Sequence, residues 1–379
     1  MSEQPPAPAV DGYHRGYAPT PRGPERPRRP AHTSVSGRTA AILVTVVVLI
    51  AGVALLNLVD VAKVIYRPGP VHDTLGESNG RPVVGVEGVE TFPTTGRLDF
   101  TTVTLDGGPR FPVSAWDWLL AEVDPSADVV DEEQVYPPDV TAEQVQEQNT
   151  ELMLNSQEGA AVVALRADGE TVPEHILVAQ IVVDAPASGV LEINDEIVSV
   201  DDTEIATPED VRDALQEFDP GDTVPFEILR GEEEQSVQVP TGETDERTVI
   251  GVYLASEFDL PYEIDIDAGN VGGPSAGLMF ALAVYDKITP GAMTGGQAFA
   301  GTGTITSAGE VGSIGGIRQK MIAAEQSGAD YFLAPADNCD DVRGNEPDGL
   351  TVARVETFEQ AREIVEGVGA GESIEIPSC

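Results

Sequence analysis

Basic side chains are scarce in this chain of 379 residues. It has 21 lysines and arginines against 65 aspartates and glutamates, which gives a formal net charge of −44. A surface this acidic repels phosphate, so the composition argues against nucleic acid as a partner. Only three of the basic residues are lysines: Lys63, Lys287 and Lys320.

Histidine and nucleotide-binding motifs are also lacking. The four histidines are His14, His32, His72 and His175, and none lies in the roughly two hundred residues that follow. No stretch fits G-x-x-x-x-G-K-[S/T], so the sequence encodes no P-loop ATPase and no ATP-driven unfoldase. We predict neither a cofactor nor a bound metal.

Cysteine is limited to Cys339 and Cys379. In an oxidising compartment a disulfide between them would close a loop of about 40 residues and contribute ~4 kcal/mol. Two free thiols are the alternative, and the spacing by itself does not choose between them.

One long apolar run stands near the N-terminus, from Ala40 to Val59. Twenty helical residues match a bilayer core of ~30 Å, whereas a cleaved signal peptide usually has a shorter run nearer Met1. We predict a disordered cytoplasmic tail over 1–38 and a retained transmembrane helix over 39–62. The tail is rich in arginine and acidic sequence follows the span, so the remainder is expected outside the cytoplasm.

A glycine-rich stretch, Asn270-Val-Gly-Gly-Pro-Ser-Ala-Gly277, leads into an apolar run that ends at Tyr285. Glycines allow a tight approach of the backbone, and proline is favoured at the first helical position. We therefore predict a helix that begins at Pro274 with Ser275 in its first turn. Unpaired N–H groups there would favour an oxyanion, which makes Ser275 a candidate nucleophile.

A serine nucleophile needs a base. Lys287 stands about three turns along the same helix, roughly 18 Å away, and is out of reach. Lys320 remains, and it would need burial to lower its pKa from ~10.4. A Ser-His-Asp triad that draws on His175 or His72 is the alternative.

These residues resemble the Lon-type proteolytic domain, whose pattern is G-P-S-A-G followed by T-G-x-I-T and G-x-V-x-x-I-G-G-x-x-x-K. The resemblance implies a Ser-Lys dyad of Ser275 and Lys320, with Thr302 helping to hold the lysine. Val271-Gly272 replaces the Lys-Asp of classical Lon, so an acidic helper is missing. The competing interpretation is an inert glycine-rich turn with a solvated lysine.

The part from 159 to 241 resembles a PDZ domain. Ala185-Pro-Ala-Ser-Gly-Val-Leu191 and the run from Asn194 to Asp202 are similar to that family's motifs, although these two end residues replace glycines. The resemblance implies binding of an extended peptide by strand addition. A small β-rich domain without a ligand is the alternative.

The flanking parts complete the predicted organisation. Residues 63–158 are expected to form a mixed α/β segment that packs with the protease, with a helix opened by Thr141 and running to about Asn155. Residues 242–379 are expected to form the Lon-type α/β domain, which opens with a strand at Val249–Leu254. The predicted fold class is α+β.

The predicted function is that of a membrane-anchored, extracytoplasmic, ATP-independent serine endopeptidase. Its partners would be peptide or unfolded protein substrates, positioned by the PDZ-like module. Lon-type domains commonly form rings, so a homo-oligomer is possible. The alternative is a non-catalytic membrane adaptor that binds peptide tails through the PDZ-like part.

Overall fold

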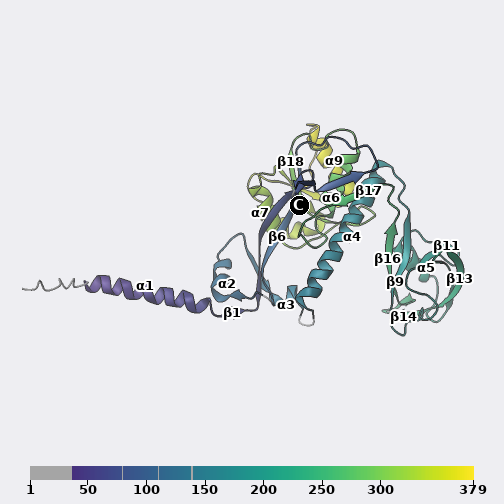
Figure 1. Cartoon of the computed structure of the whole chain (residues 1–379), viewed down its shortest axis with the longest axis horizontal. Coiled ribbons are helices and arrows are strands. Elements are labelled where there is room, and N and C mark those ends of the chain that lie inside the picture. The colour runs from purple at the N-terminus through teal and green to yellow at the C-terminus, as the bar shows by residue number, and fades with distance from the viewer. Residues whose placement is uncertain (1–35, 79, 110, 138–139) are drawn as a thin grey trace, which may run out of the picture. The chain divides into compact units, whose positions relative to one another are not determined.

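The computed structural model describes residues 36–78, 80–109, 111–137 and 140–379 (Figure 1). The described residues fall into two units that divide between Leu55 and Leu56. The tail predicted over 1–38 falls almost wholly outside the described residues. Helix α1 (Gly37–Leu56) is apolar and long enough to cross a membrane. It stops short of residue 62, where we predicted its end, because Asn57 and Asp60 interrupt the apolar run.

The larger unit contains a β-rich part built on one six-stranded sheet. Its order is β13-β12-β10-β9-β16, with β11 pairing β10. The strands are β9 (Glu174–Ile181), β10 (Asp195–Val200), β11 (Thr203–Glu204), β12 (Thr223–Arg230), β13 (Glu233–Pro240) and β16 (Val252–Phe258). Helix α5 (Pro208–Leu215) begins with a capping box between Thr207 and Asp210, and its buried side faces this sheet's core.

Strand β16 corrects one assignment made from the sequence. We predicted Val249–Leu254 as the opening strand of the protease-like part, but β16 pairs antiparallel with β9 over its whole length. Its alternate residues Val252 and Leu254 pack on the core of the β-rich part. Alternating apolar residues indicate that one face of a strand is buried, but they do not indicate which sheet the strand joins.

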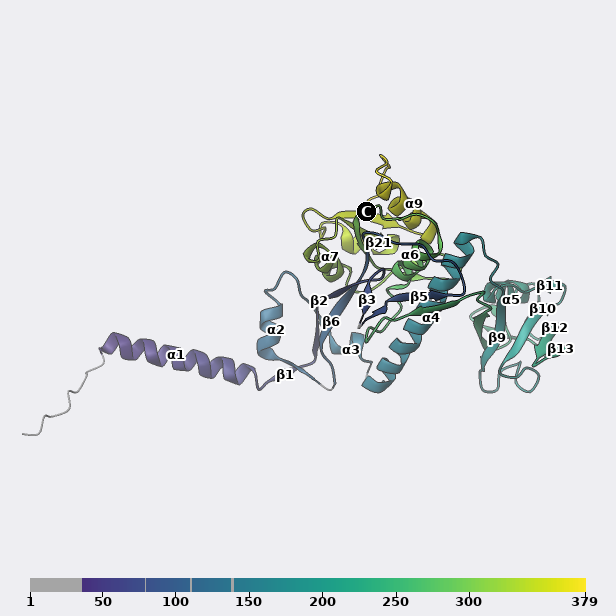
Figure 2. The same ribbon diagram turned by 45° about the horizontal axis from the view of Figure 1, so that its top comes forward.

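A second six-stranded sheet contains strands that precede the β-rich part in the sequence and strands that follow it (Figure 2). Its order is β22-β21-β18-β6-β2-β8. The strands are β2 (Lys63–Asp73), β6 (Arg97–Gly107), β8 (Asp128–Asp131), β18 (Ala298–Gly301), β21 (Tyr331–Pro335) and β22 (Thr351–Val355). The β6–β18, β18–β21 and β21–β22 pairs are parallel. The β-rich part is thus inserted between two halves of one folded domain.

Helices cover both faces of this sheet. Helices α6 (Gly277–Ile288), α4 (Ala142–Asp168) and α9 (Phe358–Gly369) share one apolar core with its first face, while α7 (Ile317–Gln326) and α8 (Cys339–Val342) pack on the other. Successive strand residues such as Phe299 and Ala300 point to opposite cores, as the period of a strand requires. The α+β class predicted from the sequence is confirmed.

Helix α4 is longer than predicted. Its capping box at Thr141 and Gln144 is as expected, but the helix continues past Asn155 to Asp168 and crosses residue 159, where we placed the start of the PDZ-like part. Residues Gly159–Leu165 are buried, and most of them share with α6 the apolar core beneath the second six-stranded sheet. The apolar run that we assigned to the next part is therefore the inner face of one continuous helix.

Short elements complete the described fold. They are β1 (Asp60–Val61), β3 (Glu77–Ser78), β4 (Arg81–Pro82), β5 (Val84–Glu87), β7 (Val113–Ser114), α2 (Ala115–Ala121), α3 (Glu132–Val135), β14 (Gly242–Thr244), β15 (Arg247–Val249), β17 (Glu263–Ile266), β19 (Thr304–Ile305), β20 (Val311–Gly312) and η1 (Ala336–Asn338). Cys339 and Cys379 are joined by a disulfide, which settles the choice that the sequence left open.

Candidate active site

Ser275 lies in a turn immediately before α6. The helix begins at Gly277, so the prediction that Pro274 is its first residue is wrong. The carbonyl oxygen of Ser275 instead accepts hydrogen bonds from the amide of Gly303 (2.8 Å) and the hydroxyl of Thr302 (2.9 Å). These bonds from the segment after β18 fix the turn in a non-helical form.

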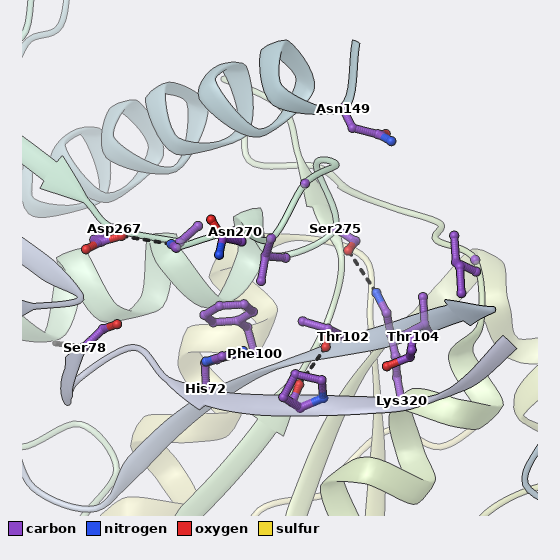
Figure 3. A pocket seen from close by; sticks show the side chains of 18 of the residues that line it. His72, Ser78, Phe100, Thr102, Thr104, Asn149, Asp267, Asn270, Ser275 and Lys320 are labelled. Carbon is purple, nitrogen blue, oxygen red and sulfur yellow. Dashed lines mark hydrogen bonds between the residues drawn. The ribbon is translucent and has the colours of Figure 1, made fainter. Parts of the chain in front are cut away.

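Lys320 reaches Ser275 from the opposite side of the sheet. It belongs to α7, and its Nζ lies 2.9 Å from the Oγ of Ser275 and 2.8 Å from the Oγ1 of Thr302 (Figure 3). Thr302 directly follows the carboxyl end of β18. The three predicted site residues therefore meet beyond the end of one parallel strand, where functional groups from both helical layers can converge.

Lys320 is almost completely removed from water, with 2% of the residue exposed. Burial lowers the pKa of Lys320 from 10.5 to about 7, since the charged form loses its hydration. No carboxylate among the described residues forms an ion pair with this amine. Near neutral pH a large share of Lys320 is consequently the free base.

Thr302 fixes the orientation of that base. Its single hydroxyl proton is donated to the carbonyl of Ser275, so toward Lys320 it acts as an acceptor of an N–H. A neutral amine has two N–H donors and one lone pair. With one donor held by Thr302, the lone pair is free to accept the hydroxyl proton of Ser275.

The Ser275–Lys320 pair opens onto a cleft of about 750 Å³. Apolar and polar side chains both line it, and Figure 3 shows His72, Phe100 and Asn270 toward one end and Thr104 and Asn149 toward the other. Further lining residues are Thr102, Val103, Val271, Gly272 and Gly315. A cleft that continues past the serine on two sides suits an extended chain.

Neither histidine of the alternative triad hydrogen-bonds Ser275. His175 lies on β9 of the β-rich part, where its contact with Glu196 (2.6 Å) raises the pKa of the imidazole. His72 does line the cleft, but its ring stacks on Phe100, with centroids 5.0 Å apart. Burial lowers the pKa of His72.

Two residues of α4 support the serine turn and were missed by sequence reasoning. The hydroxyl of Ser156 donates to the carbonyl of Pro274 (2.9 Å), and the carbonyl of Asn149 accepts from the amide of Gly273 (2.8 Å). A Cβ on Gly277 would come within 2.7 Å of the Ser156 hydroxyl, so the close approach needs glycine there. The one available signal was a serine inside a buried helical run.

Comparison with known families agrees with this arrangement. Residues 261–366 match the Lon protease (S16) C-terminal proteolytic domain, and residues 145–241 match a PDZ domain. Residues 261–366 are a Lon-type serine peptidase domain. The chain thus combines a Lon-type domain with a PDZ domain and one apolar N-terminal helix, which confirms the resemblances drawn from the motifs.

The relatives share the Lon-type domain. Lon protease 1 of Herpetosiphon aurantiacus is 30% identical over 124 residues, which cover 33% of this chain and 15% of that protein. The Lon protease of Buchnera aphidicola is 33% identical over 111 residues, 28% of this chain and 14% of that protein. The chain thus spans only about a seventh of the length of these relatives.

Among solved structures, the PDZ domain of an SdrC-like protein from Listeria monocytogenes is similar to part of the chain. It is 22% identical, covers 21% of this chain and 85% of that chain, and superimposes with a TM-score of 0.20. A PDZ domain of an SdrC-like protein from Listeria innocua has 21% identity, covers 21% of this chain and 92% of that chain, and has the same TM-score of 0.20.

Proposed function

We propose that the protein is a membrane-anchored serine endopeptidase that works outside the cytoplasm without ATP, with Ser275 as nucleophile and Lys320 as general base. The observation that carries the proposal is the 2.9 Å contact between the Oγ of Ser275 and the amine of the buried Lys320. Thr302 has the role of a positioning residue, because it touches the lysine and the serine backbone but not the reacting oxygen.

In the first step neutral Lys320 takes the Oγ proton of Ser275, and the Oγ attacks the carbonyl carbon of the substrate. The resulting ammonium gives its proton to the leaving amine as the C–N bond breaks, which leaves an acyl-Ser275 ester. Lys320, neutral again, then deprotonates a water that attacks the ester. Release of the acid regenerates the hydroxyl.

The oxyanion of each tetrahedral intermediate needs N–H donors. The amides of Ser275 and Ala276 donate no hydrogen bond to another group among the described residues. They belong to the turn that Thr302, Gly303 and Ser156 hold in place. Fixed and unused donors of this kind are worth ~3 kcal/mol of barrier each.

The PDZ-like part would position the substrate through the outer edge of β16. This strand ends the sheet order, so one of its two edges has no neighbouring strand in the described part of the chain. An extended peptide can add to such an edge. After Phe258 the chain continues from β16 into β17 and then into the Ser275 turn. The edge that would bind a peptide is therefore joined to the cleft by the segment between Phe258 and Ser275.

Location and energy source rest on separate observations. The length and apolarity of α1 support an anchor, and the Cys339–Cys379 disulfide supports an oxidising compartment. The sequence holds no P-loop motif, which supports hydrolysis without ATP. Assembly as a homo-oligomer, which Lon-type rings suggest, stays a prediction.

The test compares the full chain with its Ser275→Ala and Lys320→Ala variants on a diverse peptide library read by mass spectrometry. We expect cleavage by the wild type and none by either variant, with all three showing the same circular dichroism. A serine-directed fluorophosphonate should add mass at Ser275 only where Lys320 is intact. Binding of C-terminal peptides without turnover or labelling would support the adaptor function instead.

A further inference from the structure

We propose that the outward side of helix α2 lies in the membrane–water interface beside the anchor, and holds the ectodomain on the bilayer surface. The proposal rests on the membrane anchor proposed above. The α2 outer face is formed by Trp116, Leu119 and Leu120 of the helix and by Val123 in the turn that follows it.

The spacing of these residues places them on one side of the helix. Trp116, Leu119 and Leu120 follow one another at i, i+3 and i+4, which lie on one side of a helix surface. Val123 lies in the turn just after the helix. The opposite side, with Trp118 and Ala121, packs on a small core that includes Ile65 and Val113. Helix α2 is therefore apolar on two sides, although one side suffices for its packing.

The α2 outer face is open to solvent in the described structure. Leu119, Leu120 and Val123 are 47%, 44% and 75% exposed, and Trp116 is half-buried. Most apolar side chains exposed in this way on a soluble surface are scattered singly, whereas these are contiguous. A contiguous face of this kind needs an occupant.

Chain connectivity points to lipid as that occupant. Helix α1 ends at Leu56, and the carbonyl of Val59 accepts a hydrogen bond from the amide of Ala115, the first residue of α2, at 2.7 Å. Three residues span at most ~11 Å, so α2 must begin close to where the anchor leaves the bilayer. Figure 2 shows α2 beside β1, the strand that follows the anchor. The intervening Leu58 is itself 80% exposed.

The aromatic content agrees with an interfacial position. The chain has two tryptophans, and both, Trp116 and Trp118, belong to α2. Tryptophan is enriched where a protein meets the headgroup region, because the ring is apolar and its N–H needs a polar partner. The indole N–H of Trp118 already donates to Glu122.

The charges around the α2 outer face indicate which kind of lipid it contacts. Acidic side chains, Asp117 and Glu122, flank the α2 outer face, and no lysine or arginine occurs between Arg110 and Arg166. Arg67 of the neighbouring strand β2 is already paired with Asp106 and Asp124, so attraction to anionic headgroups is weak and insertion of apolar side chains drives the contact. We expect the contact on neutral phosphatidylcholine and expect it to be insensitive to salt.

The two tryptophans provide the measurement. The full chain is reconstituted in phosphatidylcholine vesicles with or without bromines on the upper acyl chain, and tryptophan emission is compared. An interfacial helix lies ~5–10 Å deep, so we expect the brominated lipid to quench emission about twofold. The Trp118→Phe variant, which keeps Trp116, should be quenched more than the Trp116→Phe variant, which keeps the inner ring.

Matched substitutions separate insertion from mere proximity. The double variant Leu119→Glu/Leu120→Glu should lose the quenching, whereas Val183→Glu, at a position 87% exposed on the β-rich part, should retain it. Equal quenching of both single-tryptophan variants, or no quenching while the protein still floats with the vesicles, would overturn the proposal. If tryptophan emission changes with the protein-to-lipid ratio and does not change with bromination, the α2 outer face binds a second copy of the chain and not lipid. Failure to float would instead refute the anchor.

Discussion

At the scale of single residues, the proposed mechanism depends on the protonation state of Lys320. The amine is buried, contacts two hydroxyl oxygens and has no acidic partner among the described residues. Two hydroxyls stabilise an ammonium far less than a carboxylate would, so desolvation dominates and the free base prevails at moderate pH.

This state predicts the pH dependence of turnover. Because the pKa of Lys320 is lowered to about 7, the base is neutral above that pH, and kcat/KM should rise through pH 7 and level off at higher pH. Lys320→Arg should reduce kcat/KM by about 10²–10⁴-fold at every pH, since a guanidinium stays protonated. Rates are measured on a short peptide from pH 5 to 9. A wild-type profile that is flat across this range would contradict Lys320 as the base.

Thr302 offers a second prediction at this scale. Thr302→Val keeps the shape and removes both hydrogen bonds, so we expect kcat to fall about tenfold, the equivalent of ~1.4 kcal/mol, with KM unchanged. Thr302→Ser restores the hydroxyl and should recover most of the rate. If valine and serine variants behave alike, the hydroxyl does not position the lysine.

At the scale of elements, segments distant in sequence hold the serine turn. Helix α4 supplies Ser156 and Asn149 from one side, and the segment after β18 supplies Thr302 and Gly303 from the other. Helix α7, which carries Lys320, shares a separate core with α8 and the chain's last residue, Cys379. The position of the lysine thus depends on how well this second core is closed.

The disulfide closes that core and can be tested. Cys379→Ser should lower the free energy of unfolding by ~4 kcal/mol, because the unfolded chain regains the freedom of a loop of about 40 residues. Urea denaturation measures the difference. A reducing agent should destabilise the wild type to the same level and leave the variant unchanged, and an unaffected wild type would show that the bridge contributes no stability.

At the scale of the whole molecule, the β-rich part is an insertion whose two ends lie side by side. Glu174, the first residue of β9, pairs with Phe258, the last residue of β16, and the amide of Asp259 donates to the carbonyl of Pro173 (3.1 Å). A chain that leaves and re-enters a domain at neighbouring points can be excised with little strain.

We therefore predict that replacing residues 174–258 with a short Gly-Ser linker leaves a folded peptidase. The rate of hydrolysis of a short peptide should stay within about twofold of the wild type, because all residues that line the cleft lie outside the insertion. Cleavage of long unfolded substrates should fall when the β16 edge is lost. An insoluble or inactive product would show that the β-rich part is needed to fold the protease.

The sequence by itself determined which residues are candidates for the proposed chemistry, through a Gly-Pro-Ser turn and a scarcity of lysine and histidine that left one amine. It also determined the apolar run near the N-terminus and the cap residue that opens α4. These are local signals, set by residue type and short spacing. Only the tertiary structure decided that β16 joins the β-rich sheet, that α4 runs on into the protease core, and that Cys339 meets Cys379. Each of these depends on which distant segment packs on an apolar face or supplies the second cysteine. A local sequence pattern does not identify that distant segment.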